Sequence, residues 1–301
     1  MTTRTIRSPV EWVASQIMHI LRGLLAIGRA LYHVGETWGV PAPSVRRITY
    51  SDLRRALTLG YRDFTAYRGD VFFLLLLYPV LSFLLARVAF GMSLLPLLFP
   101  FASGLIILGP VAAVGLYEMS RQREHRQKIN WFNGFEVIYR PAFGSILLLS
   151  LLLVAIFALW LAAAWGIFLH TVGPIGPTSV GAFVHDVLAT DAGHAMIVIG
   201  IGVGFLFAMV AMVISVVSLP LLVDHDVGLD SAVKTSFRAV TANPLPIAAW
   251  SGIVVLGLII GAVPLFLGLV VILPVLGHAT WHLYQKLVER EDRADQPGVS
   301  R

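Results

Sequence analysis

Six apolar segments, each long enough to cross a lipid bilayer, constrain the fold of this chain more than any other feature of its sequence. About 20 consecutive apolar residues form a helix that crosses a hydrocarbon core of about 30 Å. The segments run over Val71–Phe90, Leu94–Tyr117, Phe143–Leu169, Ala195–Val223, Leu245–Ala262 and Leu265–Leu283. Gly261 and Pro264 separate the last two segments and favour a tight hairpin between them. We therefore predict an all-α fold, a polytopic membrane bundle of six transmembrane helices.

The composition agrees with lipid as the main solvent. Apolar residues make up 57% of the 301 residues and charged residues only 13%, whereas an average soluble protein has about 25% charged residues. A soluble fold of this size would still expose roughly a quarter of its unfolded surface to water. Cysteine is absent, which excludes disulfides, thiolate metal sites and cysteine nucleophiles.

Lysine and arginine are concentrated in the connections on one side of the predicted bundle. Ten precede residue 71, five lie in 118–142, two lie in 224–244 and four follow residue 283, whereas the loop 170–194 has none. Basic residues that flank a span are retained in the cytoplasm. We predict a multi-pass protein of the bacterial cytoplasmic (inner) membrane with both termini cytoplasmic. The basic connections are expected to contact anionic lipid headgroups, not nucleic acid.

The regions outside the six segments divide the chain into three parts. Residues 1–49 are predicted to form a cytoplasmic N-terminal extension with an amphipathic helix, residues 50–288 the six-helix membrane domain, and residues 289–301 a cytoplasmic polar tail. A second amphipathic helix is predicted from about Ser51 to Tyr67, at the start of the membrane domain. Helices of this kind lie in the membrane interface or dock on the underside of the bundle.

The second amphipathic helix has a similar segment further along the chain. Aligning Leu53 with Leu229 also pairs the following identical residues: Ala56 with Ala232, Arg62 with Arg238, Thr65 with Thr241 and Ala66 with Ala242. A weaker third copy is Trp131–Arg140. Each copy precedes two membrane segments, which suggests three repeat units at about 50–120, 129–226 and 227–288. Chance similarity between short amphipathic helices is the alternative.

Few ionisable residues fall near the predicted spans, and they lie toward helix ends. The candidate polar cluster or ligand-binding residues are Tyr117, Glu118, Asp224, His278, His282 and Tyr284. They place polar groups at the cytoplasmic ends of the second, fourth and sixth helices, and residues retained near membrane depth are candidates for function. His278 and His282 share one helix face, so they could bind metal or haem, relay protons or form interhelical hydrogen bonds. We expect no metal or other cofactor, with haem or metal at this pair as the alternative.

Five stretches of the chain resemble one family. They are LRRALTLGYRD (Leu53–Asp63), ILGPVAAVGLYEMSR (Ile107–Arg121), SLPLLVDHD (Ser218–Asp226), Ser236–Pro244 and LPVLGHATWHLY (Leu273–Tyr284). These resemble the DUF2189 family of predicted prokaryotic integral membrane proteins, and the resemblance runs from about Ile48 to Val288. It implies a membrane protein from a family without an established function.

No hydrolase motif or phosphate-binding loop is present, so we name no catalytic residue and expect a protein that is not an enzyme. The leading hypothesis is an accessory or scaffolding component of a membrane assembly, with a membrane-protein partner or a second copy of itself. The alternative is a small-solute or ion transporter or channel that uses the polar cluster. A third hypothesis is a lipid-modifying or lipid-binding protein that acts at the cytoplasmic interface.

Overall fold

The computed structural model describes residues 28, 32–66, 92–124, 131–174, 176–264 and 267–289. These residues form α2 (Tyr50–Ala66), η2 (Met92–Leu97), α4 (Leu98–Ala112), α5 (Val114–Glu124), η3 (Trp131–Tyr139), α6 (Phe143–Thr171), α7 (Val180–Ala189), α8 (Asp191–Ser215), α9 (Ser218–Asp224), α10 (Leu229–Ala242), α11 (Pro244–Ala262) and α12 (Leu269–Leu287). Within this part of the chain, β-pairing is limited to an isolated bridge between Val45 and Val288. The prediction of an all-α fold is confirmed.

Four stretches of the described chain are helical, long and apolar enough to cross a membrane. They are Leu94–Glu124, Phe143–Thr171, Asp191–Asp224 and Pro244–Ala262. Each coincides with one of the six predicted segments. The predicted span Val71–Phe90 lies outside the described residues. The predicted span Leu265–Leu283 corresponds to α12, which is not among the four, and the total of six spans remains a prediction.

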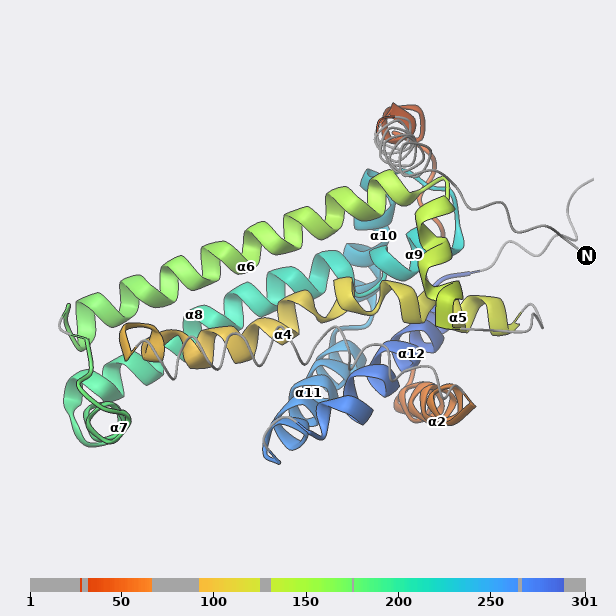
Figure 1. The fold of residues 1–301 in the computed structure, drawn as a ribbon. Coiled ribbons are helices and arrows are strands. Elements are labelled where there is room, and N and C mark those ends of the chain that lie inside the picture. The colour runs from red at the N-terminus through yellow and green to blue at the C-terminus, as the bar shows by residue number, and fades with distance from the viewer. Residues whose placement is uncertain are drawn as a thin grey trace, which may run out of the picture.

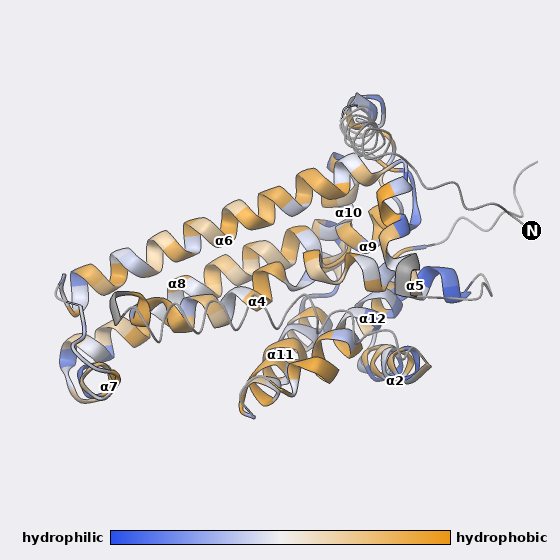
Figure 2. Cartoon of the chain, viewed as in Figure 1, coloured by the Kyte–Doolittle hydropathy of each residue, from blue (hydrophilic) through white to orange (hydrophobic). Residues whose placement is uncertain are grey.

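The helices α4, α6 and α8 form an elongated apolar bundle, and the apolar helix α11 lies apart from it beside α12 (Figure 1). We call these four helices the shaft. Helix α6 packs against α8 and α4, and α8 also packs against α4. Most of the shaft surface is hydrophobic (Figure 2). On α8, the side chains of Val198 and Phe205 are 71% and 65% exposed. Large apolar side chains exposed in this number are expected where lipid, not water, surrounds the helices.

A second group of helices gathers at one end of the shaft, opposite to α7, and forms a region that we call the cap (Figure 1). The cap consists of α2, α5, η3, α9, α10 and the C-terminal half of α12, residues 277–287. Many of its apolar side chains are buried, and Leu219, Leu221 and Trp281 have no exposed surface. The core of the protein is therefore densest in the cap.

Small residues allow the cap helices to approach one another closely. An added Cβ on Gly60 of α2 would lie 2.6 Å from the Cβ of Ala279 on α12. Gly134 of η3 also lies close to the backbone of α5, because a Cβ there would be 3.3 Å from the carbonyl oxygen of Gly115. Small residues at helix crossings are typical of membrane proteins.

The segment before α2 is attached to the last residues of α12 and to the start of α11. The backbone N–H of Arg46 donates to the carbonyl of Leu287 at 2.8 Å, and that of Glu289 donates to Ser44 at 3.1 Å. The Asn243 side chain accepts a hydrogen bond from the N–H of Ile48 at 2.8 Å and donates to the carbonyl of Arg46 at 3.0 Å. These bonds fix the position at which α2 begins.

Several helix boundaries differ from the sequence-based prediction, and the predicted helix Leu94–Tyr117 is divided among η2, α4 and α5. The segment predicted as one helix over Ala195–Val223 is divided into α8 and α9. Pro220 has no N–H to donate to the carbonyl of Val216, four residues earlier, which favours a break there. The loop predicted over 170–194 contains the short helix α7, whose first turn is capped by the Ser179 hydroxyl.

Candidate functional site

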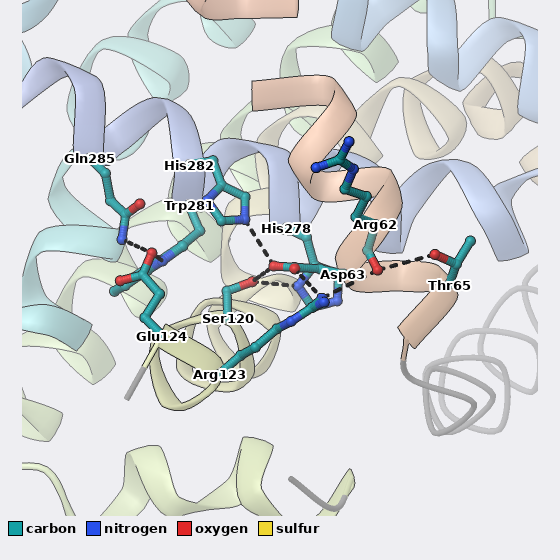
Figure 3. Close-up of polar contacts among 10 residues, drawn as sticks. All are labelled: Arg62, Asp63, Thr65, Ser120, Arg123, Glu124, His278, Trp281, His282 and Gln285. Carbon is teal, nitrogen blue, oxygen red and sulfur yellow. Dashed lines mark hydrogen bonds and ion pairs between the residues drawn. The ribbon is translucent and has the colours of Figure 1, made fainter. Parts of the chain in front are cut away.

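A buried polar cluster lies where α2, α5 and α12 meet in the cap, and we call it the Asp63 cluster. Its members are Asp63, Ser120, Arg123, His278 and His282 (Figure 3). Asp63, Ser120 and the two histidines are buried. Asp63 lies on α2 because it continues the buried stripe of Leu53, Ala56 and Gly60, at spacings of three and four residues. The fold therefore turns this carboxylate inward, toward α5 and α12.

The hydrogen bonds of the cluster converge on the Asp63 carboxylate (Figure 3). Ser120 Oγ donates to Asp63 Oδ2 at 2.8 Å, and His282 Nε2 donates to the same oxygen at 2.9 Å. Arg123 forms an ion pair with Asp63 Oδ1. Ser120 Oγ is also 2.7 Å from His278 Nδ1. A serine hydroxyl has a single hydrogen, so when that hydrogen points to Asp63, His278 Nδ1 carries the proton that it donates to Ser120.

These neighbours stabilise the charged form of Asp63. Burial by itself raises the pKa of the Asp63 carboxyl, but the hydrogen bond from His282, the charges of His282 and His278, and the hydrogen bond from Ser120 outweigh it. The net effect holds the pKa of Asp63 below its usual value. Asp63 is thus a buried carboxylate whose charge is balanced by the helices packed around it.

A second buried carboxylate, Glu118, lies on α5, two residues before Ser120, and it has its own set of contacts. Arg121 and Arg140 each contact both of its oxygens, with the shortest distance 2.6 Å between Arg140 Nη2 and Glu118 Oε1. Gln122 Nε2 donates to Glu118 Oε1 at 2.7 Å and to Glu136 Oε2 at 2.9 Å. Two-pronged contacts between arginine and carboxylate are strong and specific in geometry. They attach the segment around η3 to α5.

The other predicted site residues form separate contacts. Tyr284 donates its hydroxyl hydrogen to Asp224 Oδ2 at 2.9 Å, which joins α12 to α9. His225 Nε2 is 3.4 Å from the same carboxylate. Tyr117 is buried and forms a side-chain hydrogen bond with Thr280. The structure brings His278 and His282 together, and separately Asp224 and Tyr284, whereas Glu118 belongs to a different set of contacts.

Sequence reasoning missed three residues that organise these contacts: Asp63, Ser120 and Arg140. The signal for Asp63 was present, because a carboxylate that continues an apolar stripe at helical spacing must be buried and needs partners. Ser120 follows Tyr117 by three residues and falls on the same inward face of α5. Arg140 gave no comparable signal, because its partner Glu118 is 22 residues away in the sequence.

The Asp63 cluster contains the residue types of a Ser-His-Asp triad in a different order. In such a triad the histidine lies between the serine and the aspartate, whereas here Ser120 lies between His278 and Asp63. Ser120 is also fully buried. The described residues contain no group of three or more His, Cys, Asp or Glu side chains placed to hold a metal ion. The geometry suits a fixed hydrogen-bond network that can hold or pass protons.

A family model matches the part of the chain that runs from α4 to the end of α9. Residues 97–224 match the model described as predicted integral membrane protein (DUF2189). We call this matched segment the DUF2189 region. Neither the curated proteins nor the solved structures give a match. The DUF2189 region includes Glu118 with all of its partners. It also includes Ser120, whereas Asp63 and His278, which contact Ser120, come from helices outside it. The match and the apolar helices together indicate an integral membrane protein.

Proposed function

We propose that the protein is a non-enzymatic accessory or scaffolding component of a membrane assembly in the bacterial inner membrane. One observation carries the proposal: the buried carboxylates of the cap, Asp63 and Glu118, are paired with donors inside it. Asp63 contacts Ser120, His282 and Arg123, and Glu118 contacts two arginines and a glutamine. Polar groups engaged in this way build a rigid cap.

The shaft is the surface that this proposal assigns to partners. Its exposed faces are apolar. In the helical stretch Asp191–Asp224, only 6% of the most hydrophobic 18-residue segment is buried inside the protein. Helices associate within a membrane through close van der Waals packing. A rigid cap that fixes the directions of apolar helices would present such a surface to a membrane-protein partner or to a second copy of the chain.

Site-specific photo-crosslinking in the native membrane tests the scaffolding role. A benzoyl-phenylalanine placed at the exposed Phe205 of α8 is expected to capture a reproducible membrane protein, identified by mass spectrometry. The same group at Phe168 of α6, which is buried, is the matched control. Lipid adducts without a protein adduct at Phe205 and other exposed shaft positions, together with a lone monomer on purification, would contradict the proposal.

We also infer six spans with both termini cytoplasmic, and three repeat units. The packing supports the repeat because each amphipathic segment contacts the last helix of the preceding unit in a cyclic order. Helix α2 packs on α12, η3 on α5, and α10 on α9. The chain lacks cysteine, so single cysteines can report sidedness. In intact cells an impermeant maleimide should label a cysteine at Gly181 and spare one at Arg238.

Anionic lipid headgroups are the proposed partners of α2. Arg54, Arg55 and Arg62 line a surface hollow of about 390 Å³ together with Ser51 and Thr58. The three guanidinium groups lack an ion pair with any carboxylate of the described chain. Arginines on an amphipathic helix attract phosphatidylglycerol and similar lipids. Replacing all three with Gln should reduce the phosphatidylglycerol that copurifies, whereas Arg238→Gln on α10 should not.

The rival function is transport of a small solute or ion, and the Asp63 cluster is the observation that favours it. A chain from His278 through Ser120 to Asp63 and His282 could carry protons. One ring nitrogen of each histidine is already engaged, His278 Nδ1 by Ser120 and His282 Nε2 by Asp63, and we propose no cofactor at this pair. In proteoliposomes, a proton or solute flux that is lost in His278→Ala and His282→Ala would favour the rival over the scaffold.

A further inference from the structure

An apolar cavity of about 360 Å³ lies in the shaft, at the end away from the cap. It is enclosed by η2 and the start of α4, by α6, by α7 and by the first half of α8. Its innermost residues are Trp160 and Ala164 of α6, and Gly200 lines it from α8. This volume falls in the range of about 300–1,000 Å³ that is typical of ligand sites.

The walls of the cavity are held in place, so the space is built into the fold. Trp160 is buried and its indole N–H donates to Pro100 O at 3.2 Å and to Ser103 Oγ at 3.1 Å. Its ring packs on Gly204, where an added Cβ would lie 3.0 Å from the indole. The Thr190 hydroxyl joins α7 to α8, because it donates to the carbonyl of Asp186 in α7 at 2.5 Å and accepts from the N–H of Gly193 in α8 at 3.0 Å.

Water is a poor occupant of this space. A buried water molecule needs two to four polar partners, and the side chains that line the cavity are apolar except for the Trp160 indole, whose N–H is already engaged. The mouth is formed by exposed apolar side chains, including Phe99, Val184 and Ile201. These continue into the exposed apolar face of the shaft. In an integral membrane protein, that face is in contact with hydrocarbon.

We propose that this cavity binds one acyl chain of a membrane phospholipid. The chain enters from the lipid between α4, α7 and α8, and its end contacts Trp160 and Ala164. The apolar walls supply the affinity because each buried methylene adds a favourable contribution. The site is separate from the cap, and it does not depend on whether the protein is a scaffold or a transporter.

A phospholipid with a diazirine at the end of one acyl chain tests the proposal in nanodiscs. Irradiation should label Trp160 and Ala164, which are buried, as well as Leu159, which is 61% exposed on α6 and reports contact with bulk lipid. The ratio of labelling at Ala164 to labelling at Leu159 measures occupancy of the cavity. Labelling confined to Leu159 and other outward positions would overturn the proposal.

Two glycines of α8 provide a matched pair of variants. Gly200 lines the cavity and Gly202 does not, and an added Cβ meets nothing within 4 Å at either position. Gly200→Phe should fill the cavity and lower the labelling ratio about tenfold, with Gly202→Phe at the wild-type ratio. Equal ratios in the two variants would reject the site. Labelling of Ala164 by a diazirine fatty acid but not by the phospholipid would reject the phospholipid as occupant.

Discussion

The cap and the shaft are built from the same chain but are held together by different interactions. In the cap, buried carboxylates contact several donors each, and glycines bring helix backbones close together. In the shaft, apolar side chains face outward, and lipid tails are as apolar as the leucines they touch. A change in the cap must therefore break a specific contact, whereas a change on the outer face of the shaft exchanges one apolar surface for another. Stability should reside in the cap.

Replacing Glu118 is the strongest test of this difference. In Glu118→Ala, Arg121 and Arg140 would remain in the cap without their shared carboxylate. Removing one partner of a buried ion pair costs about 3–5 kcal/mol, so we expect the free energy of unfolding in mixed micelles to fall by that amount. Glu118→Gln should lose less because it keeps hydrogen-bonding atoms. The shaft control is Leu159→Ala, and an equal loss there would refute the comparison.

Gly60 tests the close approach of backbones in the cap. A larger side chain would collide with the Cβ and N of Ala279, each 2.6 Å from an added Cβ, and overpacking of this kind costs about 1–3 kcal/mol. Gly60→Leu should displace α2 from α12 and make the bonds after Arg54 and Arg55 more sensitive to trypsin. In the shaft control Gly202→Leu, an added Cβ meets nothing within 4 Å. This variant should leave the digestion pattern unchanged. Similar digestion of both variants would show that α2 does not depend on this contact.

The sequence predicted the shaft better than the cap. The reason is that the shaft follows from local runs of apolar residues, whereas the cap follows from contacts between distant residues. Crossing a membrane requires a run of apolar residues, which can be counted locally, so Phe143–Leu169 and Leu245–Ala262 were placed to within two residues of the observed spans Phe143–Thr171 and Pro244–Ala262. The cap depends on pairs that are far apart in sequence. Asp63 and His282 are 219 residues apart, and their contact follows from the packing of α2 on α12, which no local pattern reveals. The sequence analysis grouped six candidate residues at the helix ends as one polar cluster, whereas in the structure Glu118, the histidine pair, and Asp224 with Tyr284 belong to separate sets of contacts.

Asp63 provides a test of the cap by pH. Its pKa in the folded protein lies below the value of about 3.9 for an unfolded aspartate. Its charge therefore stabilises the fold above about pH 4, and this contribution is lost as the pH falls through the folded-state pKa. Asp63→Asn should cost about 2 kcal/mol at pH 7 and should flatten the decrease in unfolding temperature between about pH 5 and pH 3. The exposed Asp186 of α7 supplies the control, Asp186→Asn. A pH profile that is unchanged in Asp63→Asn would exclude Asp63 as the source.

The smallest effect is expected at the edge of the cap, where His33 contacts Asp226 at 3.0 Å and Glu36 at 3.2 Å. Hydrogen bonds to Asp226 and then to Glu36 raise the pKa of His33. Its contribution is therefore complete below the unfolded value of about 6.5 and is lost as the pH rises through the folded-state pKa. The pair is partly exposed, so solvent screening limits the contribution to about 0.5 kcal/mol. Amide exchange of residues 32–40, corrected for the intrinsic pH dependence, should increase from pH 6 to pH 8 in the wild type and change less in His33→Gln. An equal increase in both would show that protonation of His33 does not hold this segment on the cap.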